Sequence, residues 1–396
     1  MSARRFVVAA FGDAGHAFPA IALGRALRRR GHDVVVETWE QWREAVEAEG
    51  LRFSAAEEYT AFPPAPLGDG ETASAADAAL ALAPLMEEFR PDVVVSDILT
   101  LAPSLAAERA GARRATLIPH VYPVHEAGLP FFALGAQPPR TPAGGAMWRA
   151  WLPVLTSGLR RGRREMNETR AAVGLPPLDG FQGGISGELA LVATFPQLEY
   201  PRRWPGHVHV TGPMEFELAY AAIELPEGSD PLVLVAASTA HDPELRLVRS
   251  SLEALADEPV RVVATTNRPG ADGVLPAAPA NAVVVDWLSY SRVMPEAAMV
   301  VCHGGHGTVA RALGQGVPVL GCPAAGDMAE NSARVAWAGA GLMLPWRLVG
   351  PGPVRWATRR ILSDTRYRAR AAAIASWAQH HDGAVRSAEL VEQLLE

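Results

Sequence analysis

The chain has 396 residues, of which 49% are hydrophobic and 20% charged, and its net charge is −7 at neutral pH. That length is sufficient for two domains with separate hydrophobic cores. The acidic balance argues against a nucleic-acid partner, because a phosphate backbone requires a basic protein surface. The 36 basic residues are all arginine, which excludes a Walker P-loop and a pyridoxal Schiff base, since both need a lysine amine.

The first half of the chain alternates short, β-branched stretches with helical stretches, which is the pattern of a doubly wound α/β domain. The apolar stretch at residues 6–11 is too short for a secretory signal and stops at Gly12, so we interpret it as the first strand. The first helix is predicted to open at Pro19, because proline favours the first helical position, and to end at Gly31. The predicted strands cover residues 5–11, 33–38, 51–54, 93–96, 115–118, 189–194 and 208–210.

A second series of strands and helices follows a linker. Its predicted strands cover residues 232–236, 260–265, 282–286, 299–302, 317–320 and 342–344, and residues 366–396 are predicted to be helical throughout. The fold class is therefore α/β, with two facing Rossmann-like domains whose ligands lie beyond the carboxyl ends of parallel strands. The expected boundaries are residues 1–214 for the N-terminal domain, 215–230 for the linker, 231–378 for the C-terminal domain and 379–396 for a final helix. No apolar stretch of about 18 residues occurs, so no membrane-spanning helix is expected.

A phosphate site is predicted where the strand at residues 299–302 leads into a helix at residues 308–315. Gly304, Gly305 and Gly307 let backbone N–H groups approach an anion at the start of that helix, and His303 adds a donor. A cluster of acidic and amide side chains at residues 327–331 follows the next strand. One polar group suited to phosphate and another suited to hydroxyl groups indicate a nucleotide sugar.

Two long loops interrupt the first half of the chain, at residues 58–76 and 119–145. Long, partly apolar loops over a rigid sheet usually carry binding function, so we expect them to line an acceptor pocket. The alternative is that they are surface loops with incidental aromatic side chains. The aromatic and imidazole side chains of the second loop are His120, Tyr122, His125, Phe131 and Phe132.

Cys302 and Cys322 are the only cysteines, and both flank the predicted phosphate loop. We interpret them as small core residues in a protein of the reducing cytoplasm, not as a disulfide or a metal-binding pair. The basic run at residues 160–164 is interpreted as a solvated helix face.

Four segments together resemble the family-1 glycosyltransferases of GT-B fold. These segments are residues 15–19 (GHAFP), 286–288 (DWL), 303–308 (HGGHGT) and 326–331 (GDMAEN). The similarity covers essentially the whole chain and is greatest to bacterial enzymes that glycosylate polyketides and other natural products. It implies a cleft between the two domains and a C-terminal helix that crosses back to the first domain. It also implies inverting transfer of a sugar from a UDP- or dTDP-linked donor to a hydroxyl group, or a carbon atom, of a hydrophobic aglycone.

The resemblance also implies roles for individual residues. His16 occupies the position of the catalytic base, and Asp97 that of the acid that orients it. The donor-binding residues would be Ser238, Thr239, Trp287, His303, Gly304, Gly305, Gly307, Thr308, Asp327, Met328 and Asn331, and the acceptor-binding residues His120, Tyr122, Phe131 and Phe132. No metal or other cofactor is implied, because backbone donors and His303 face the diphosphate charge. The chain is expected to be a monomer or a homodimer.

The sequence departs from the family pattern at three places. Arg311 stands where a glutamate commonly holds the ribose, which leaves the ribose contact unassigned. Met328 stands where hexose-using relatives often have glutamine, which suggests a sugar with fewer polar contacts. Tyr290 and Ser291 replace the residues that usually follow the tryptophan in this family. The choice between uracil and thymine as the base of the donor therefore stays open. Asp13 also remains open as an alternative partner for His16.

Three other classes of protein share some of these sequence features. A dehydrogenase would use the first turn as a dinucleotide fingerprint with Glu37 on the ribose, but residues 11–16 lack the required glycine spacing. A nucleotide-sugar epimerase shares the architecture but does not need a wide apolar acceptor loop. A catalytically silent binding protein of the same fold is the non-enzyme alternative, and the presence of both His16 and Asp97 argues against it.

Overall fold

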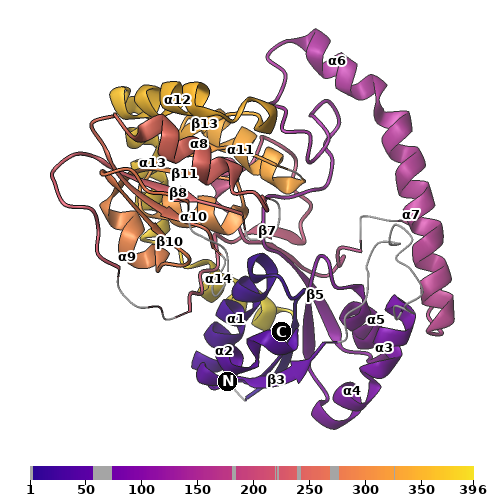
Figure 1. Ribbon diagram of the computed structural model, residues 1–396. Coiled ribbons are helices and arrows are strands. Elements are labelled where there is room, and N and C mark those ends of the chain that lie inside the picture. The colour runs from indigo at the N-terminus through magenta and orange to yellow at the C-terminus, as the bar shows by residue number, and fades with distance from the viewer. Residues whose placement is uncertain are drawn as a thin grey trace.

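The structure is a computed structural model that describes residues 3–56, 74–180, 184–218, 220, 223–238, 242–267, 276–324 and 326–396. Within these residues, seven parallel strands form one sheet in the order β3-β2-β1-β4-β5-β6-β7, and six form a second sheet in the order β10-β9-β8-β11-β12-β13. Figure 1 shows the two resulting domains, the first in indigo to magenta and the second in orange to yellow. The predicted α/β fold with two Rossmann-like parallel sheets is confirmed.

Every predicted strand has a counterpart in the structure. The first sheet contains β1 (Arg5–Ala9), β2 (Asp33–Thr38), β3 (Arg52–Ala55), β4 (Val93–Asp97), β5 (Arg113–Ile118), β6 (Ala190–Val192) and β7 (Val208–Val210). The second contains β8 (Leu232–Ala236), β9 (Arg261–Thr265), β10 (Ala282–Val285), β11 (Ala297–Cys302), β12 (Val319–Gly321) and β13 (Gly341–Met343).

Helices connect the strands and cover both sheets. In the first domain they are α1 (Ala14–Arg29), α2 (Arg43–Ala48), α3 (Ala75–Ala81), α4 (Ala83–Phe89), α5 (Leu101–Ala110), α6 (Pro142–Ala150) and α7 (Leu152–Ala172). In the second they are α8 (Arg246–Leu255), α9 (Tyr290–Val293), α10 (His306–Gly314), α11 (Asp327–Ala338), α12 (Pro351–Ser363), α13 (Thr365–Ala378) and α14 (Gly383–Gln393). Short 3₁₀ helices cover Glu40–Trp42, Pro196–Leu198, Met294–Glu296 and Trp346–Leu348. Among the described helices, none has the length and apolar character needed to cross a membrane.

Both faces of the first sheet are buried. Successive side chains of a strand point to opposite faces, so Phe6 and Val8 pack with α1 and α14 whereas Val7 packs with α3 and α5. This explains why the strands are nearly continuous apolar runs. The same arrangement holds in the second sheet, where consecutive residues of β8 belong to two separate clusters: Leu234 lies in one and Val235 in the other.

The first helix begins a full turn earlier than predicted. α1 starts at Ala14 because the carbonyl of Asp13 accepts hydrogen bonds from the amides of His16 and Ala17, both at 2.9 Å. Pro19 therefore lies inside the helix, where it removes one backbone hydrogen bond that the remainder of a 16-residue helix sustains. As a result, His16 is held in the first turn of a helix.

The prediction of one continuous C-terminal helix was wrong. The helix is interrupted between α13 and α14. The side chain of Asp382 caps α14 by accepting hydrogen bonds from the amides of Ala384 and Val385 at 2.9 and 3.0 Å. Helix α14 then packs beside α1 of the first domain (Figure 1). The carboxylate of Glu392 accepts a hydrogen bond from Arg30 at 2.7 Å, and its other oxygen lies 2.6 Å from Nε2 of His32. These contacts hold the C-terminal helix against the first domain.

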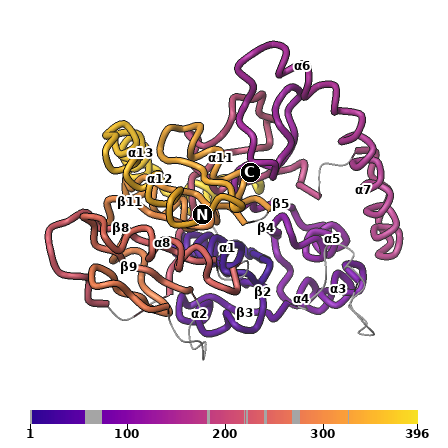
Figure 2. Tube along the Cα trace, turned by 45° about the horizontal axis from the view of Figure 1, so that its top comes forward, coloured from indigo at the N-terminus to yellow at the C-terminus, as the bar shows by residue number. Residues whose placement is uncertain are grey.

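Helices α6 and α7 stand at the edge of the molecule in both views (Figure 1, Figure 2). The basic run at residues 160–164 lies on α7 and is largely exposed, as expected for a solvated face. Cys302 and Cys322 are buried free thiols, which confirms that they are core residues. Of the loop predicted at residues 58–76, the part at 58–73 lies outside the described residues, and the remainder leads into α3.

Candidate active site

His16 lies at the carboxyl edge of the first sheet because the turn after β1 is tightly constrained. A side chain at Gly12 would come within 1.8 Å of the Trp39 ring, so only glycine fits beneath that indole. The carbonyl of Gly12 accepts hydrogen bonds from Trp42 at 2.7 Å and from Gln41 at 2.9 Å. The loop after β2 therefore holds the turn that carries His16.

His16 and Asp97 are in direct contact. The Nδ1 atom of His16 lies 2.8 Å from Oδ2 of Asp97, whose side chain is fully buried at the end of β4. The other carboxylate oxygen of Asp97 accepts from the amide of Leu99 at 2.8 Å, which fixes its orientation. With Nδ1 donating to Asp97, the free Nε2 of His16 is the atom that can accept a proton.

The surroundings of His16 make it a stronger base. Burial alone would lower the pKa of His16, but the charge and hydrogen bond of Asp97 outweigh burial and raise the pKa above its ordinary value. Asp327 and Asp13 contribute smaller charge effects in the same direction. Asp13 caps α1 through its backbone carbonyl, so the structure places Asp97, not Asp13, as the hydrogen-bond partner of His16.

Two of the four acceptor-loop candidates lie next to His16. The ring of His120 is 6.3 Å from that of His16, and the ring of Phe132 is 5.6 Å from that of His120. Burial, and then repulsion from His16, lower the pKa of His120. Its Nδ1 donates to the carbonyl of Val121 at 2.8 Å, so a neutral His120 presents Nε2 as an acceptor. Phe132 also packs against the core of the second domain.

The other two candidates have different surroundings. Phe131 contacts His125 and Trp148, with ring distances of 4.9 and 5.8 Å. Tyr122 is 2% exposed, and its ring lies 5.4 Å from that of Trp204. The structure therefore gathers His120 and Phe132 with His16, whereas Phe131 and Tyr122 are in contact with other aromatic side chains.

The phosphate loop joins β11 to α10, which begins at His306, two residues before the predicted start. Gly304 has a φ of +83°, and a side chain there would lie 2.3 Å from Oγ of Ser332. A side chain at Gly305 would lie 2.5 Å from Nε2 of His303, so the imidazole folds directly over that glycine. The two glycines thus allow α11 and His303 to approach the start of α10, where Gly307 is exposed and Thr308 half-buried.

The segment predicted to hold the sugar begins α11, beside the phosphate loop. Nδ2 of Asn331 donates to the carbonyl of Gly304 at 3.1 Å and to Oδ2 of Asp327 at 3.2 Å. Asp327 is half-buried at the start of α11, a helix that packs against Pro196–Leu198 of the first domain, and its charge favours protonation of His16. Met328 is 9% exposed. The donor candidates on α11 and the base candidate therefore lie where the two domains meet.

The remaining donor candidates lie at other strand ends of the second sheet. Ser238 is buried just after β8, and Thr239 lies outside the described residues. Trp287 follows β10, and its ring lies 5.2 Å from that of Tyr220 in the linker. Arg311 donates to the carbonyl of Phe216, so the residue at the family's ribose position holds the linker in this chain.

Sequence reasoning missed the contacts that join the domains. His306 lies 3.0 Å from the carbonyl of Ala193, and burial lowers its pKa to about 4, which keeps it neutral. Arg334 of α11 forms an ion pair with Glu199 of the first domain at 2.7 Å. His306 was visible in the phosphate motif, but its partner is a backbone carbonyl, which leaves no signal in a sequence.

Comparison with known proteins decides the family. The glycosyltransferase family 28 N-terminal domain matches residues 6–114, and the erythromycin biosynthesis protein CIII-like C-terminal domain matches residues 249–395. The chain is 31% identical to 4'-demethylrebeccamycin synthase of Lentzea aerocolonigenes over 100% of both proteins. It belongs to the GT-B glycosyltransferases of natural-product biosynthesis.

Other relatives of this glycosyltransferase agree. It is 29% identical to O-mycaminosyltylonolide 6-deoxyallosyltransferase of Streptomyces fradiae over 84% of this chain and 83% of that protein. The solved glycosyltransferase of kitacinnamycin superimposes with a TM-score of 0.78 at 21% identity, covering 100% of this chain and 99% of that one. The glycosyltransferase VinC, solved in complex with DTDP, has a TM-score of 0.70 at 20% identity, covering 98% and 99%. These two structures support the GT-B fold.

Proposed function

We propose that this glycosyltransferase moves a sugar, with inversion at the anomeric carbon, from a nucleoside diphosphate donor to a hydroxyl group of a hydrophobic aglycone. The observation that carries the proposal is the 2.8 Å contact between Nδ1 of His16 and the buried carboxylate of Asp97. A histidine oriented in this way presents Nε2 as a general base where the two domains meet.

The reaction follows from these positions. Nε2 of His16 takes the proton of the acceptor hydroxyl as its oxygen attacks the anomeric carbon, and Asp97 stabilises the imidazolium that forms. The bond between the anomeric carbon and the phosphate oxygen breaks, and the diphosphate leaves with the bonding electrons. The backbone N–H groups at the start of α10, together with His303, would stabilise that departing charge.

A UDP- or dTDP-linked donor is proposed. The complex of VinC with DTDP supports a thymidine nucleotide, and Trp287 offers an aromatic face for the base. We propose that no metal is required, because the helix start and His303 supply donors for the diphosphate. Activity should persist in the presence of a chelator, and a strict magnesium requirement would contradict this part of the proposal.

The acceptor is proposed to be a natural product that lies against His120 and Phe132, the two loop side chains beside His16. The relative that is a 6-deoxyallosyltransferase supports a donor sugar that lacks a hydroxyl group, which fits the thioether at Met328. If so, Met328→Gln should shift preference toward fully hydroxylated hexose donors, and identical donor ratios in the two proteins would remove this idea.

A panel of UDP and dTDP sugars tests the proposal. Each donor is incubated with one phenolic aglycone, and the products are identified by mass. A new glycoside that is lost in both His16→Ala and Asp97→Asn supports the assignment. Conversion of the donor to its epimer without glycoside would favour the epimerase alternative instead.

A further inference from the structure

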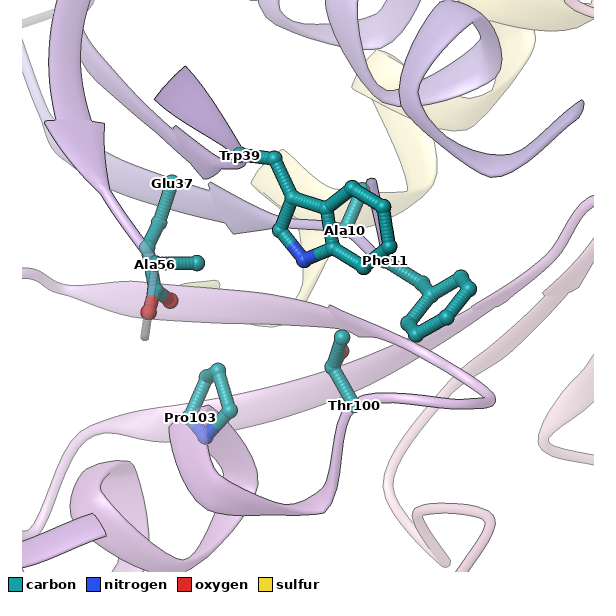
Figure 3. A pocket seen from close by; sticks show the side chains of 7 residues that line it. All are labelled: Ala10, Phe11, Glu37, Trp39, Ala56, Thr100 and Pro103. Atoms are coloured by element: carbon teal, nitrogen blue, oxygen red, sulfur yellow. The ribbon is translucent and has the colours of Figure 1, made fainter. Parts of the chain in front are cut away.

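A small cavity lies beyond the carboxyl ends of β1, β2 and β3, beside the start of α5. It has a volume of about 20 Å³, enough for one water molecule or one group of similar size. Figure 3 shows its lining, with Glu37 on one side and the rings of Trp39 and Phe11 on the other. The remaining lining residues in the described part of the chain are Ala10, Ala56, Thr100 and Pro103.

Glu37 is an unusual wall for such a cavity. It is the penultimate residue of β2 and is 5% exposed, and its Oε2 atom accepts no hydrogen bond from any residue that the structure describes. Among the residues that the structure describes, no other lining residue carries a titratable group, and burial raises the pKa of Glu37 to about 8 with no charged neighbour of this part of the chain contributing. Burying a carboxyl group without a partner opposes folding, and such a group is typical of a site where a ligand supplies the partner.

The cavity is close to the proposed base. The Phe11 ring lies 5.0 Å from the ring of Trp39, which lines the cavity, and 6.0 Å from the ring of His16. Phe11 therefore contacts both the proposed base and a wall of the cavity that Glu37 lines. The hydroxyl of Thr100, which lines the cavity, donates a hydrogen bond to the backbone carbonyl of Asp97 at 2.9 Å. The cavity therefore also lies next to Asp97, the partner of His16.

The lining favours a cation over a neutral group. A carboxyl group that faces an ammonium ionises and forms a charge-assisted hydrogen bond, which is stronger than a bond between neutral groups. The rings of Trp39 and Phe11 line the same cavity and can attract a positive charge that meets a ring face, and an ammonium group is about the size of a water molecule.

We propose that Glu37 recognises a protonated amine on the acceptor, so that the preferred aglycones carry both a hydroxyl group and a basic nitrogen. This inference rests on the proposed function, because it assumes that the acceptor hydroxyl lies at His16. Glu37 is then a residue that determines acceptor specificity and takes no part in the chemistry.

Binding of matched probes, measured without donor, tests the inference. Tyramine carries an amine at the end of its arm, 4-propylphenol a methyl group and tyrosol a hydroxyl group. Wild-type protein should bind tyramine roughly 10-fold or more tightly than 4-propylphenol, and Glu37→Gln should bring the two dissociation constants together. Glu40→Gln removes an exposed charge from the segment that follows β2 and should leave the preference intact, which separates contact with Glu37 from general attraction.

Calorimetry of the wild-type protein adds a readout that does not depend on how a variant folds. At pH 7 the free Glu37 is protonated, so binding of an ammonium should release close to one proton, and the heat should vary with the ionisation enthalpy of the buffer. 4-Propylphenol should release none. An amine preference that survives in Glu37→Gln, or equal binding of tyrosol and tyramine without proton release, would overturn the inference. If no sugar is transferred to any probe, the proposed function fails while the binding comparison still decides the role of Glu37.

Discussion

Arg334 of α11 and Glu199 of the first domain form an ion pair at 2.7 Å in which the two side chains are 2% and 4% exposed. Arg334 also donates to Glu330 at 3.0 Å and to the carbonyl of Leu198 at 3.1 Å, and its guanidinium lies over the Tyr200 ring. Since α11 also carries Asp327, this network fixes the donor side of the site relative to the first domain.

Removal of the arginine should destabilise the protein strongly. Arg334→Met keeps an unbranched side chain but leaves two buried carboxylates without their cation, so the free energy of unfolding should fall by about 3–5 kcal/mol. Denaturant unfolding measures this loss. Arg161→Met, in an exposed pair with Glu165, is the matched control and should lose far less. Equal losses would mean that the buried network adds nothing beyond a surface pair.

A side chain at Gly304 should damage nucleotide binding. The residue has a φ of +83°, and a methyl group there would meet Ser332 Oγ at 2.3 Å and the Met328 carbonyl at 2.7 Å. The left-handed backbone alone disfavours alanine by about 1–2 kcal/mol, and the contacts would push α11 away from the phosphate loop. Gly304→Ala should therefore weaken binding of UDP or dTDP in calorimetry, while Gly206→Ala, which meets no atom within 4 Å, should not.

His303 is expected to donate to the diphosphate. A hydrogen bond to a charged group is typically worth ~1.5–3 kcal/mol, so His303→Ala should weaken binding of the free nucleoside diphosphate by roughly 10- to 150-fold. His380→Ala, at the exposed end of α13, provides a histidine control. Unchanged nucleotide affinity in His303→Ala would remove this role, even if turnover fell.

Glu37 should make stability depend on pH in a defined direction. Its pKa is about 8 in the folded protein against an ordinary value of 4.5, so between these values the folded state holds a proton that the unfolded chain has lost. The stabilisation from that proton is complete below pH 4.5 and is lost as the pH rises through 8. Glu37→Gln lacks this effect, so its advantage over wild type should grow by a few kcal/mol across the window, on the order expected for a buried carboxyl group. Denaturant unfolding at several pH values gives the difference, and a flat difference would mean that Glu37 is solvated.

The fold could be predicted well from the sequence, because each sheet is buried on both faces and its strands are therefore continuous apolar runs. Strands such as β4 and β8 are continuous apolar runs bounded by polar residues, and each was found within a few positions of its prediction. Helix boundaries were less predictable. Pro19 indicated a helix start, yet the carbonyl of Asp13 starts α1 earlier, and Asp382 breaks the last segment by capping α14.

The contacts that join the two domains could not be predicted. Arg334 and Glu199 are 135 residues apart, and nothing local distinguishes them from exposed charges. Glu37 had a role only in the rejected dehydrogenase alternative, whereas its significance depends on the cavity that Phe11, Trp39 and Thr100 form around it. By contrast, the pairing of His16 with Asp97 was predicted from the family resemblance. The structure explains it, because β1 and β4 are adjacent parallel strands whose carboxyl ends lie at the same edge of the sheet.

His16 is proposed to remove the acceptor proton. His16→Ala should lower turnover with weakly acidic phenols by roughly 10²–10⁴-fold and leave donor affinity nearly unchanged. Asp97→Asn should also be slow, because an amide can hold the imidazole but does not stabilise its charged form.

The most direct test is transfer to an acidic phenol such as 4-nitrophenol at raised pH, where the acceptor is already ionised and needs no base. Under these conditions His16→Ala should recover much of its lost turnover relative to wild type. If the variant recovers nothing while calorimetry shows intact donor binding, His16 positions a substrate and the proton leaves by another route.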